Sequence, residues 1–151
     1  MGDVYGVNRT LKRTGTANTI EPEVNGGVVK WIYETYVAEA LAAGSVIKLF
    51  SQDLPAEARI VDWMIDHDAL QADSDVTLAF GTNASAAALM AATTCAAANK
   101  LALLDDGAAG SLGYELSAGT GQILQLTTSS PGGDSAATGT IRVGVAYVTK
   151  G

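Results

Sequence analysis

Residues 28–37 read VVKWIYETYV, and this stretch sets the fold class that the rest of the sequence follows. Side chains alternate between the two faces of a β-strand, so odd and even positions form separate rows. One row holds Val29, Trp31, Tyr33 and Val37, and the other holds Lys30, Ile32, Glu34 and Tyr36. β-branched and aromatic residues at period two predict a long, half-buried strand.

The same alternation predicts strands on the C-terminal side. Residues 45–50 (SVIKLF) form a short strand, and residues 58–67 (ARIVDWMIDH) form a longer one. In the longer strand Asp62, Met64 and Asp66 face water, so the opposite row is the core row, namely Val61, Trp63 and Ile65. Two more strands have a single apolar row each: Val76, Leu78 and Phe80 in residues 75–81, and Ile141, Val143, Val145 and Tyr147 in residues 140–150.

The remaining segments are less regular. Residues 84–100 (ASAAALMAATTCAAANK) are the one helix candidate, which we expect to form one or two short turns capped by Asn83 or Ser85. Residues 100–104 resume as the edge of a strand. Residues 112–117 and 121–128 are expected to form a hairpin through AGTG, where glycine accepts the positive φ of a turn. Residues 129–139 form a long loop.

These seven or eight short strands show no alternation with helices, which argues against a parallel sheet. The sequence therefore predicts an all-β fold, an antiparallel two-sheet sandwich that is jelly-roll-like and has at most one short helix. An immunoglobulin-like topology is disfavoured because the Cys–Trp–Cys spacing is absent. We expect an extended N-terminal arm over residues 1–25 and one β-sandwich domain over residues 26–151.

Composition excludes several classes of function. The chain has 151 residues, a net charge of −7 and 48% apolar residues, which suits one domain that buries about 70% of its unfolded surface. An acidic balance argues against nucleic-acid partners. No stretch approaches the roughly 18 apolar residues of a membrane span, and the N-terminus lacks the apolar core of a signal peptide. We expect folding in a cytosol, no membrane partner, and a buried, inert thiol at Cys95.

The candidate chemical sites are weak. His67, the one histidine, lies among Asp62, Asp66, Asp68, Asp73 and Asp75, which permits a Ca²⁺ site or acid–base chemistry. The spacing is not that of a calcium loop, and in a strand His67 points away from Asp66 and Asp68, so a solvated acidic face is favoured. No G-x-S-x-G motif is present, and GAAGSLG at 107–113 indicates only a loop. We expect no enzymatic activity, no catalytic residue and no cofactor or metal.

The aromatic residues of the strands leave two alternatives open. Trp31, Tyr33, Tyr36 and Trp63 belong to the core or to a subunit interface, or they form a platform on which a sugar stacks. Core or interface is the favoured interpretation, because aromatic residues at strand spacing usually serve packing.

The first 13 residues, MGDVYGVNRTLKR, contrast with the acidic remainder. They carry +2, so the other 138 residues carry −9. Terminal segments are often merely unfolded, but this one mixes basic and apolar side chains, as suits an arm that orders on a partner surface. The residues expected to bind the partner are Val4, Tyr5, Val7, Arg9, Leu11, Lys12 and Arg13.

The phrases VYGVN, NGGVVKWIYETY, LPAEARIVDWMIDHDAL, TLAFGTNASAAALMAAT and ATGTIRVGVAYV resemble a family of tailed-bacteriophage capsid decoration, or cement, proteins with a jelly-roll fold. The resemblance spans nearly the whole chain. It implies a non-enzymatic virion protein that binds the outer capsid surface, bridges major capsid protein subunits and forms a homodimer or homotrimer. The alternative is a tail, head-fibre or receptor-binding component of the virion.

Overall fold

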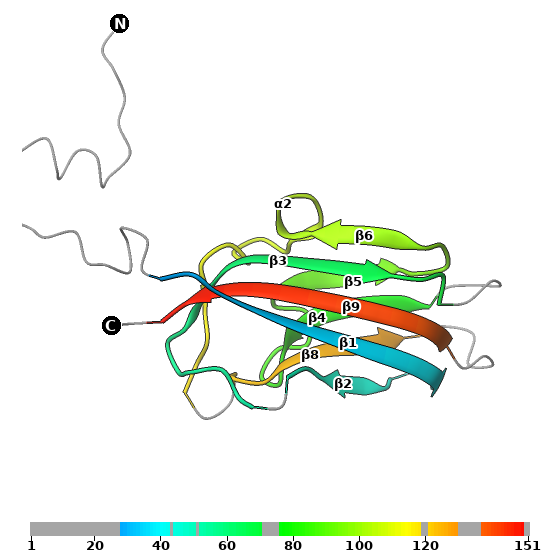
Figure 1. The fold of residues 1–151 in the computed structure, drawn as a ribbon, viewed down its shortest axis with the longest axis horizontal. Coiled ribbons are helices and arrows are strands. Elements are labelled where there is room, and N and C mark those ends of the chain that lie inside the picture. Colours follow the sequence, from blue (N-terminus) through cyan, green and yellow to red (C-terminus); the bar gives the residue numbers. More distant parts are fainter. Residues whose placement is uncertain are drawn as a thin grey trace, which may run out of the picture.

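The structure, a computed structural model, describes residues 28–42, 44–50, 52–70, 76–118, 121–129 and 137–149. The predicted arm, residues 1–25, lies outside the described residues. The described elements are one short helix and nine strands: β1 (Lys30–Leu41), β2 (Val46–Lys48), β3 (Arg59–His67), β4 (Thr77–Thr82), β5 (Met90–Thr94), β6 (Asn99–Ala102), α2 (Leu103–Asp106), β7 (Tyr114–Glu115), β8 (Leu124–Ser129) and β9 (Ala137–Val148) (Figure 1).

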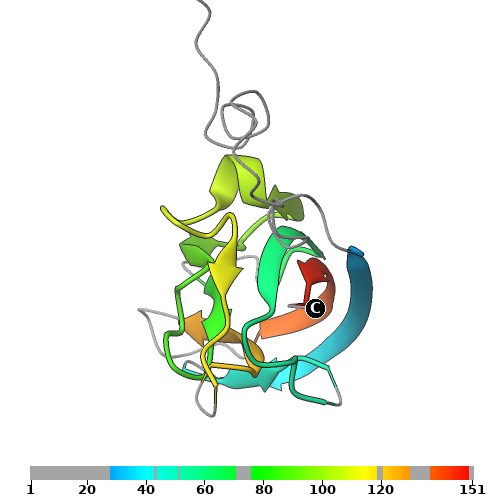
Figure 2. The ribbon, with the colours of Figure 1, turned by 90° about the vertical axis from the view of Figure 1, so that its left-hand side faces the viewer.

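The strands form two antiparallel sheets that face each other (Figure 2). Sheet A has the order β1-β9-β3-β6, with β7 also paired to β3, and sheet B has the order β2-β8-β4-β5. Successive strands pass from one sheet to the other, except at β4–β5 and β6–β7. This order, in which β9 lies between β1 and β3 while β8 lies between β2 and β4, is that of a jelly roll. The predicted fold class is therefore confirmed.

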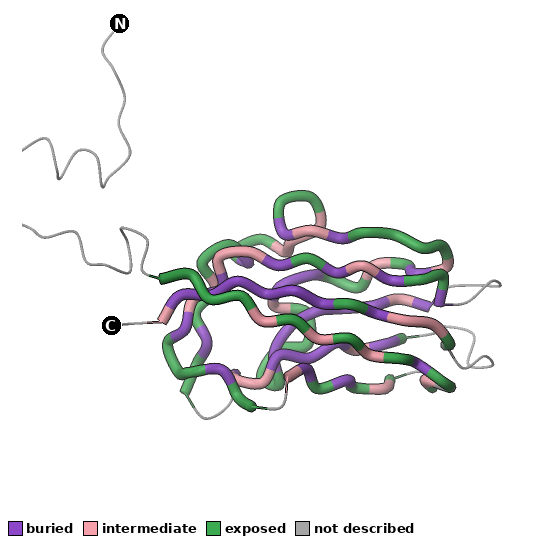
Figure 3. The backbone as a smooth tube through the Cα atoms, viewed as in Figure 1, coloured by how far each residue is buried: buried purple, intermediate pink, exposed green. Residues whose placement is uncertain are grey.

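The core lies between the sheets, where the apolar rows of β3, β4 and β9 meet (Figure 3). Trp63 of β3 and Phe80 of β4 are fully buried and form an edge-to-face pair with ring centroids 5.5 Å apart. The predicted inward rows of β4 and β9 are buried throughout. A membrane-spanning helix is absent from the described residues.

A bulge in β3 corrects one predicted core residue. The register with β9 shifts between Ile60 and Asp62, which adds a residue to β3. Ile60 is consequently buried, and Val61 is only half-buried. The predicted core positions Trp63 and Ile65, which follow the bulge, are confirmed.

The helix prediction for residues 84–100 is wrong. This segment forms a turn followed by β5 and the start of β6. The strand edge predicted for residues 100–104 is confirmed as far as Ala102, and the single described helix follows at Leu103–Asp106. Alanine favours a helix, but the segment has no continuous helical apolar face, and pairing of β5 with sheet B and of β6 with sheet A replaces that preference. Leu89 N–H donates to Phe80 O (3.0 Å) and Cys95 N–H donates to Val76 O (2.7 Å). Tertiary hydrogen bonds and burial of Leu89 therefore determine the structure of this segment.

The predicted hairpin of residues 112–117 and 121–128 is also wrong. The first segment forms β7 in sheet A, paired to β3, and the second forms β8 in sheet B. Leu116 is fully buried, and its N–H donates to Ala58 O at 2.9 Å, which directs the chain inward between the sheets. The two segments therefore belong to different sheets and do not pair with each other.

The Trp63–Phe80 contact predicts a large loss of stability on truncation. Phe80→Ala removes a fully buried ring and leaves a cavity, so the free energy of unfolding should fall by about 3–5 kcal/mol in a urea titration. Leu104→Ala is the matched control, because Leu104 is 85% exposed, and it should change stability by less than about 0.5 kcal/mol. Equal losses in the two variants would contradict this core.

Candidate interaction surface

The outer face of sheet A carries the exposed aromatic residues. Trp31 and Tyr33 are 40% and 70% exposed, and their rings stack with centroids 5.9 Å apart and planes 9° apart. Tyr36 packs partly buried against the core, and Trp63 lies within it. A single platform of four rings is therefore ruled out. Of the favoured interpretation, core or subunit interface, the core location is confirmed for Trp63, and for the exposed Trp31 and Tyr33 the interface location stays a prediction.

Small residues of β9 make room for this stack. In the pairing register, Tyr33 lies beside Gly144 and Trp31 lies beside Ala146. A Cβ atom built on Gly144 would lie 3.1 Å from two ring carbons of Tyr33 and 3.3 Å from Cγ of Met64. The rings of β1 and the thioether of β3 consequently approach each other across β9.

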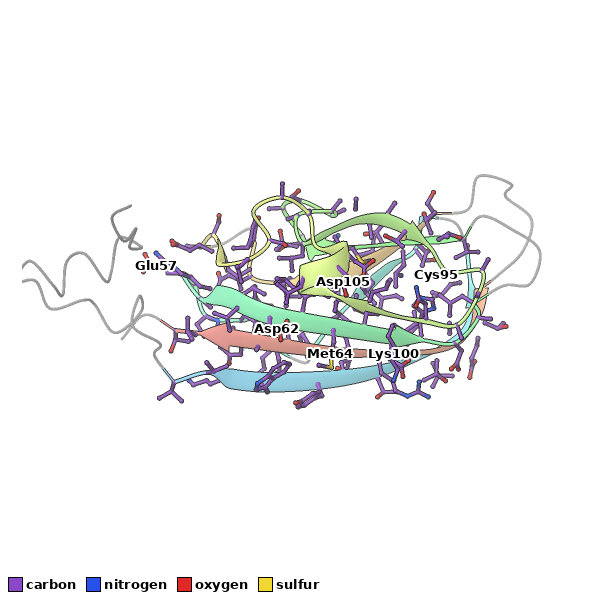
Figure 4. All side chains as sticks on the ribbon, turned by 90° about the horizontal axis from the view of Figure 1, so that it is seen from above. Glu57, Asp62, Met64, Cys95, Lys100 and Asp105 are labelled. Carbon is purple, nitrogen blue, oxygen red and sulfur yellow. The ribbon has the colours of Figure 1, made fainter. Side chains whose placement is uncertain are left out.

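A shallow hollow of about 560 Å³ lies on this face, over β1, β9, β3 and β6. Figure 4 shows β1, β9 and β3 side by side, with Met64 labelled. Its apolar part follows one row of the register, from Tyr33 across Gly144 and Met64 to Ala102. Such a surface of aromatic and thioether side chains is typical of protein contacts, where Tyr, Trp and Met are enriched.

The row of side chains next to this apolar row, across β9, β3 and β6, is charged. Arg142 Nη1 lies 3.2 Å from Oδ2 of Asp66 and 3.8 Å from Oδ1 of Asp68, and Lys100 stands beside Asp66 in the register. These ion pairs are about half exposed, so each contributes roughly 0–1 kcal/mol to stability. Their main effect is to border the apolar hollow with a row of nearly balanced charge.

The side chains around His67 are divided between the two faces of sheet A, as the alternation along β3 predicts. Asp66 and Asp68 pair with Arg142 on the outer face, whereas His67 is buried, with Nδ1 2.8 Å from Asp68 O. Asp62 accepts the Trp63 N–H at 2.8 Å. The residues that the structure describes contain no group of three metal-ligating side chains. Asp73 and Asp75 lie outside them.

Cys95 is fully buried, as predicted. Burial raises the pKa of its thiol to about 11, although a backbone hydrogen bond from Leu78 opposes this shift. A thiol with such a pKa is neutral at physiological pH and is a poor nucleophile.

The sequence-predicted partner-binding residues of the arm lie outside the described residues, namely Val4, Tyr5, Val7, Arg9, Leu11, Lys12 and Arg13. The structure adds a surface that the sequence analysis did not identify. Met64 was assigned to the solvent row of β3, and Gly144 drew no attention. Their proximity to Tyr33 depends on the pairing of β1, β9 and β3, which a single sequence does not reveal.

No protein-family model matches this chain, and no curated protein matches it. Solved structures that contain a chain of similar fold include two phage capsids. One is the capsid asymmetric unit of cyanophage Pam1, with a TM-score of 0.62, 20% identity, and coverage of 81% of this chain and 85% of that chain. The other is the capsid of Ralstonia phage GP4, with a TM-score of 0.59, 23% identity, and coverage of 82% and 85%. At these identities the similarity establishes the fold.

The burial of Cys95 predicts slow thiol chemistry. In the native protein at about pH 8, a chromogenic disulfide reagent should react with Cys95 far more slowly than with a free thiol, because the thiolate is scarce and the sulfur is inaccessible. In denaturing urea the same protein should release one equivalent of chromophore at once. Immediate reaction of the native protein would contradict the buried position.

Proposed function

We propose that this protein is a non-enzymatic structural protein of a bacteriophage virion, which binds the outer surface of the capsid and bridges major capsid protein subunits. The observation that carries the proposal is the jelly-roll strand order together with its likeness to chains of two phage capsid structures. The similarity covers 81–82% of this chain and 85% of each of those chains. The virion position would be the outer capsid surface, after synthesis in the bacterial cytoplasm.

The N-terminal arm, residues 1–25, is the proposed contact with the major capsid protein. Its basic residues Arg9, Lys12 and Arg13 would meet acidic groups of the capsid, and its apolar residues would anchor the extended chain. The charge difference between the arm and the rest of the chain supports this division, because an acidic body would otherwise be repelled by the same groups. The sandwich then holds the arm and presents the outer face of sheet A to a neighbour.

Such a protein would stabilise a capsid by mass action. A ligand that binds the assembled lattice more tightly than its dissociated subunits shifts the equilibrium toward the lattice by its binding free energy. Repeated copies add modest contacts over the whole shell, and a homodimer or homotrimer would raise the effective concentration of each arm near its site.

The exposed stack of Trp31 and Tyr33 favours a second candidate function. Flat aromatic surfaces also bind sugar rings, so the chain would then be a tail, head-fibre or receptor-binding component. A glycan array and electron microscopy of virions distinguish the two candidates. Regular protrusions on the capsid lattice support the capsid protein, whereas sugar binding with density confined to the tail supports the alternative.

Removal of the arm should abolish capsid decoration without unfolding the sandwich. A variant that begins near Gly26 retains every described strand, so its circular dichroism and thermal transition should resemble those of the full chain. In a co-sedimentation assay with undecorated capsids, the truncated protein should remain in the supernatant. Binding at full occupancy would exclude the arm as the main contact.

Charge reversal in the arm should weaken capsid binding in a salt-dependent manner. The triple variant Arg9→Glu, Lys12→Glu, Arg13→Glu replaces attraction by repulsion, and this effect is screened beyond about 10 Å at 0.1 M salt. The full chain should bind capsids more weakly as salt rises, whereas the variant should bind weakly throughout. If salt leaves the affinity of the full chain unchanged, the electrostatic part of the proposal is wrong.

A further inference from the structure

Strand β1 forms a long edge of sheet A (Figure 1). It spans Lys30–Leu41, and β9 is its one neighbour among the described strands. The other edge strands are much shorter, since β2, β5 and β6 have three, five and four residues. A long strand edge presents unpaired N–H and C=O groups that accept a further strand.

Two of the usual protections of an edge, a proline and a bulge in the middle of the strand, are missing from β1. The strand contains no proline, and its register shift lies between Ala38 and Leu41, near its end. The backbone N–H of Thr35 donates instead to the carboxylate Oε1 of Glu34, at 3.2 Å. This N–H therefore points to the free edge, and Trp31 and Tyr33 share its direction because backbone groups alternate along a strand.

The space beside this edge is also open. A hollow of about 430 Å³ lies between the inner side of β1 and the loop from Phe50 to Pro55. Ile32 and Glu34 line it from β1. The described residues thus leave both the backbone edge and the adjoining inner side accessible to another chain.

The sequence of β1 is complementary to itself in one antiparallel register. When two copies of residues 30–34 (KWIYE) are placed antiparallel with Ile32 opposite Ile32, Lys30 lies opposite Glu34 and Trp31 lies opposite Tyr33. Opposite charges and aromatic pairs at directly facing positions are the favourable cross-strand combinations. This register also makes Trp31 and Tyr33 a hydrogen-bonded pair, as the direction of their backbone groups requires.

We propose that a second copy of this chain pairs with the free edge of β1 in this register, around a two-fold axis at Ile32. The pairing joins two A sheets into one continuous antiparallel sheet and closes both edges at once, because the interface is isologous. The Trp31–Tyr33 stacks of the two copies meet on the outer face, and the two Ile32 side chains meet beside the hollow. Glu34 exchanges its contact with the Thr35 N–H for Lys30 of the second copy.

The dimer gives a specific structure to the homo-oligomer of the proposed function. The inference rests on that function only for the biological purpose of the dimer. A two-fold dimer suits a protein that bridges subunits, since it carries two arms. Its test uses the isolated full chain without capsids, so a failure of dimerisation and a failure of capsid binding are separate results.

The test is a charge-swap cycle followed by sedimentation velocity over a range of protein concentrations. Lys30→Glu and Glu34→Lys each place like charges opposite each other twice in the dimer, so each should raise the dissociation constant about tenfold or more. The double variant Lys30→Glu, Glu34→Lys restores opposite charges and should return the dissociation constant to near its original value. Lys48→Glu on β2 is the matched control, with the same change in charge on an exposed residue of sheet B, in the row opposite to that of the buried Ile47.

Each outcome decides the proposal. A dimer of the full chain that is weakened by both single variants, restored by the double variant and unaffected by Lys48→Glu supports it. A monomer at all concentrations, or a trimer, overturns it. A dimer that responds equally to Lys30→Glu and Lys48→Glu, or that the double variant does not restore, overturns this register. Circular dichroism of each variant establishes that the charge changes leave the sandwich folded.

Discussion

The pairing of β9 with β1 on one side and β3 on the other is the constraint on which sheet A depends. The two rows of side chains of β9 differ in size. The inward row, from Ile141 to Tyr147, packs against the core, and the outward row includes Gly144 and Ala146. Bulky residues in both rows would keep the aromatic rings of β1 away from Met64 of β3. The alternation within one strand thus produces both the core and the surface hollow.

Much of the fold was predictable because strand formation is a local property. Period two in residues 28–37, 58–67 and 140–150 correctly identified β1, β3 and β9. Features that depend on distant partners were missed. The bulge beside Val61 exists because β3 must fit β9. The segment 84–100 has the composition of a helix but forms strands, because hydrogen bonds to Val76 and Phe80 of sheet B are available there.

The candidate surface was predictable only in part, for the same reason. The alternation placed Trp31 and Tyr33 in one row of β1 but did not identify which row faces water. Trp63 has a similar pattern yet lies in the core, because β3 is flanked by strands on both sides and its inner row faces Phe80. Burial depends on the second sheet, and the position of that sheet is fixed by long-range pairing that propensity does not encode.

The charge distribution along β1 adds an argument about how the surface and the edge act together. Lys30 and Glu34 occupy the row opposite to that of Trp31 and Tyr33. Charge therefore selects the register from one side of the sheet, while aromatic contact adds affinity on the other. An apolar edge alone would accept many strands in many registers, which is the usual route to aggregation. A fixed pattern of two charges limits the partner to a strand with the inverse pattern, and another copy of this chain is such a strand.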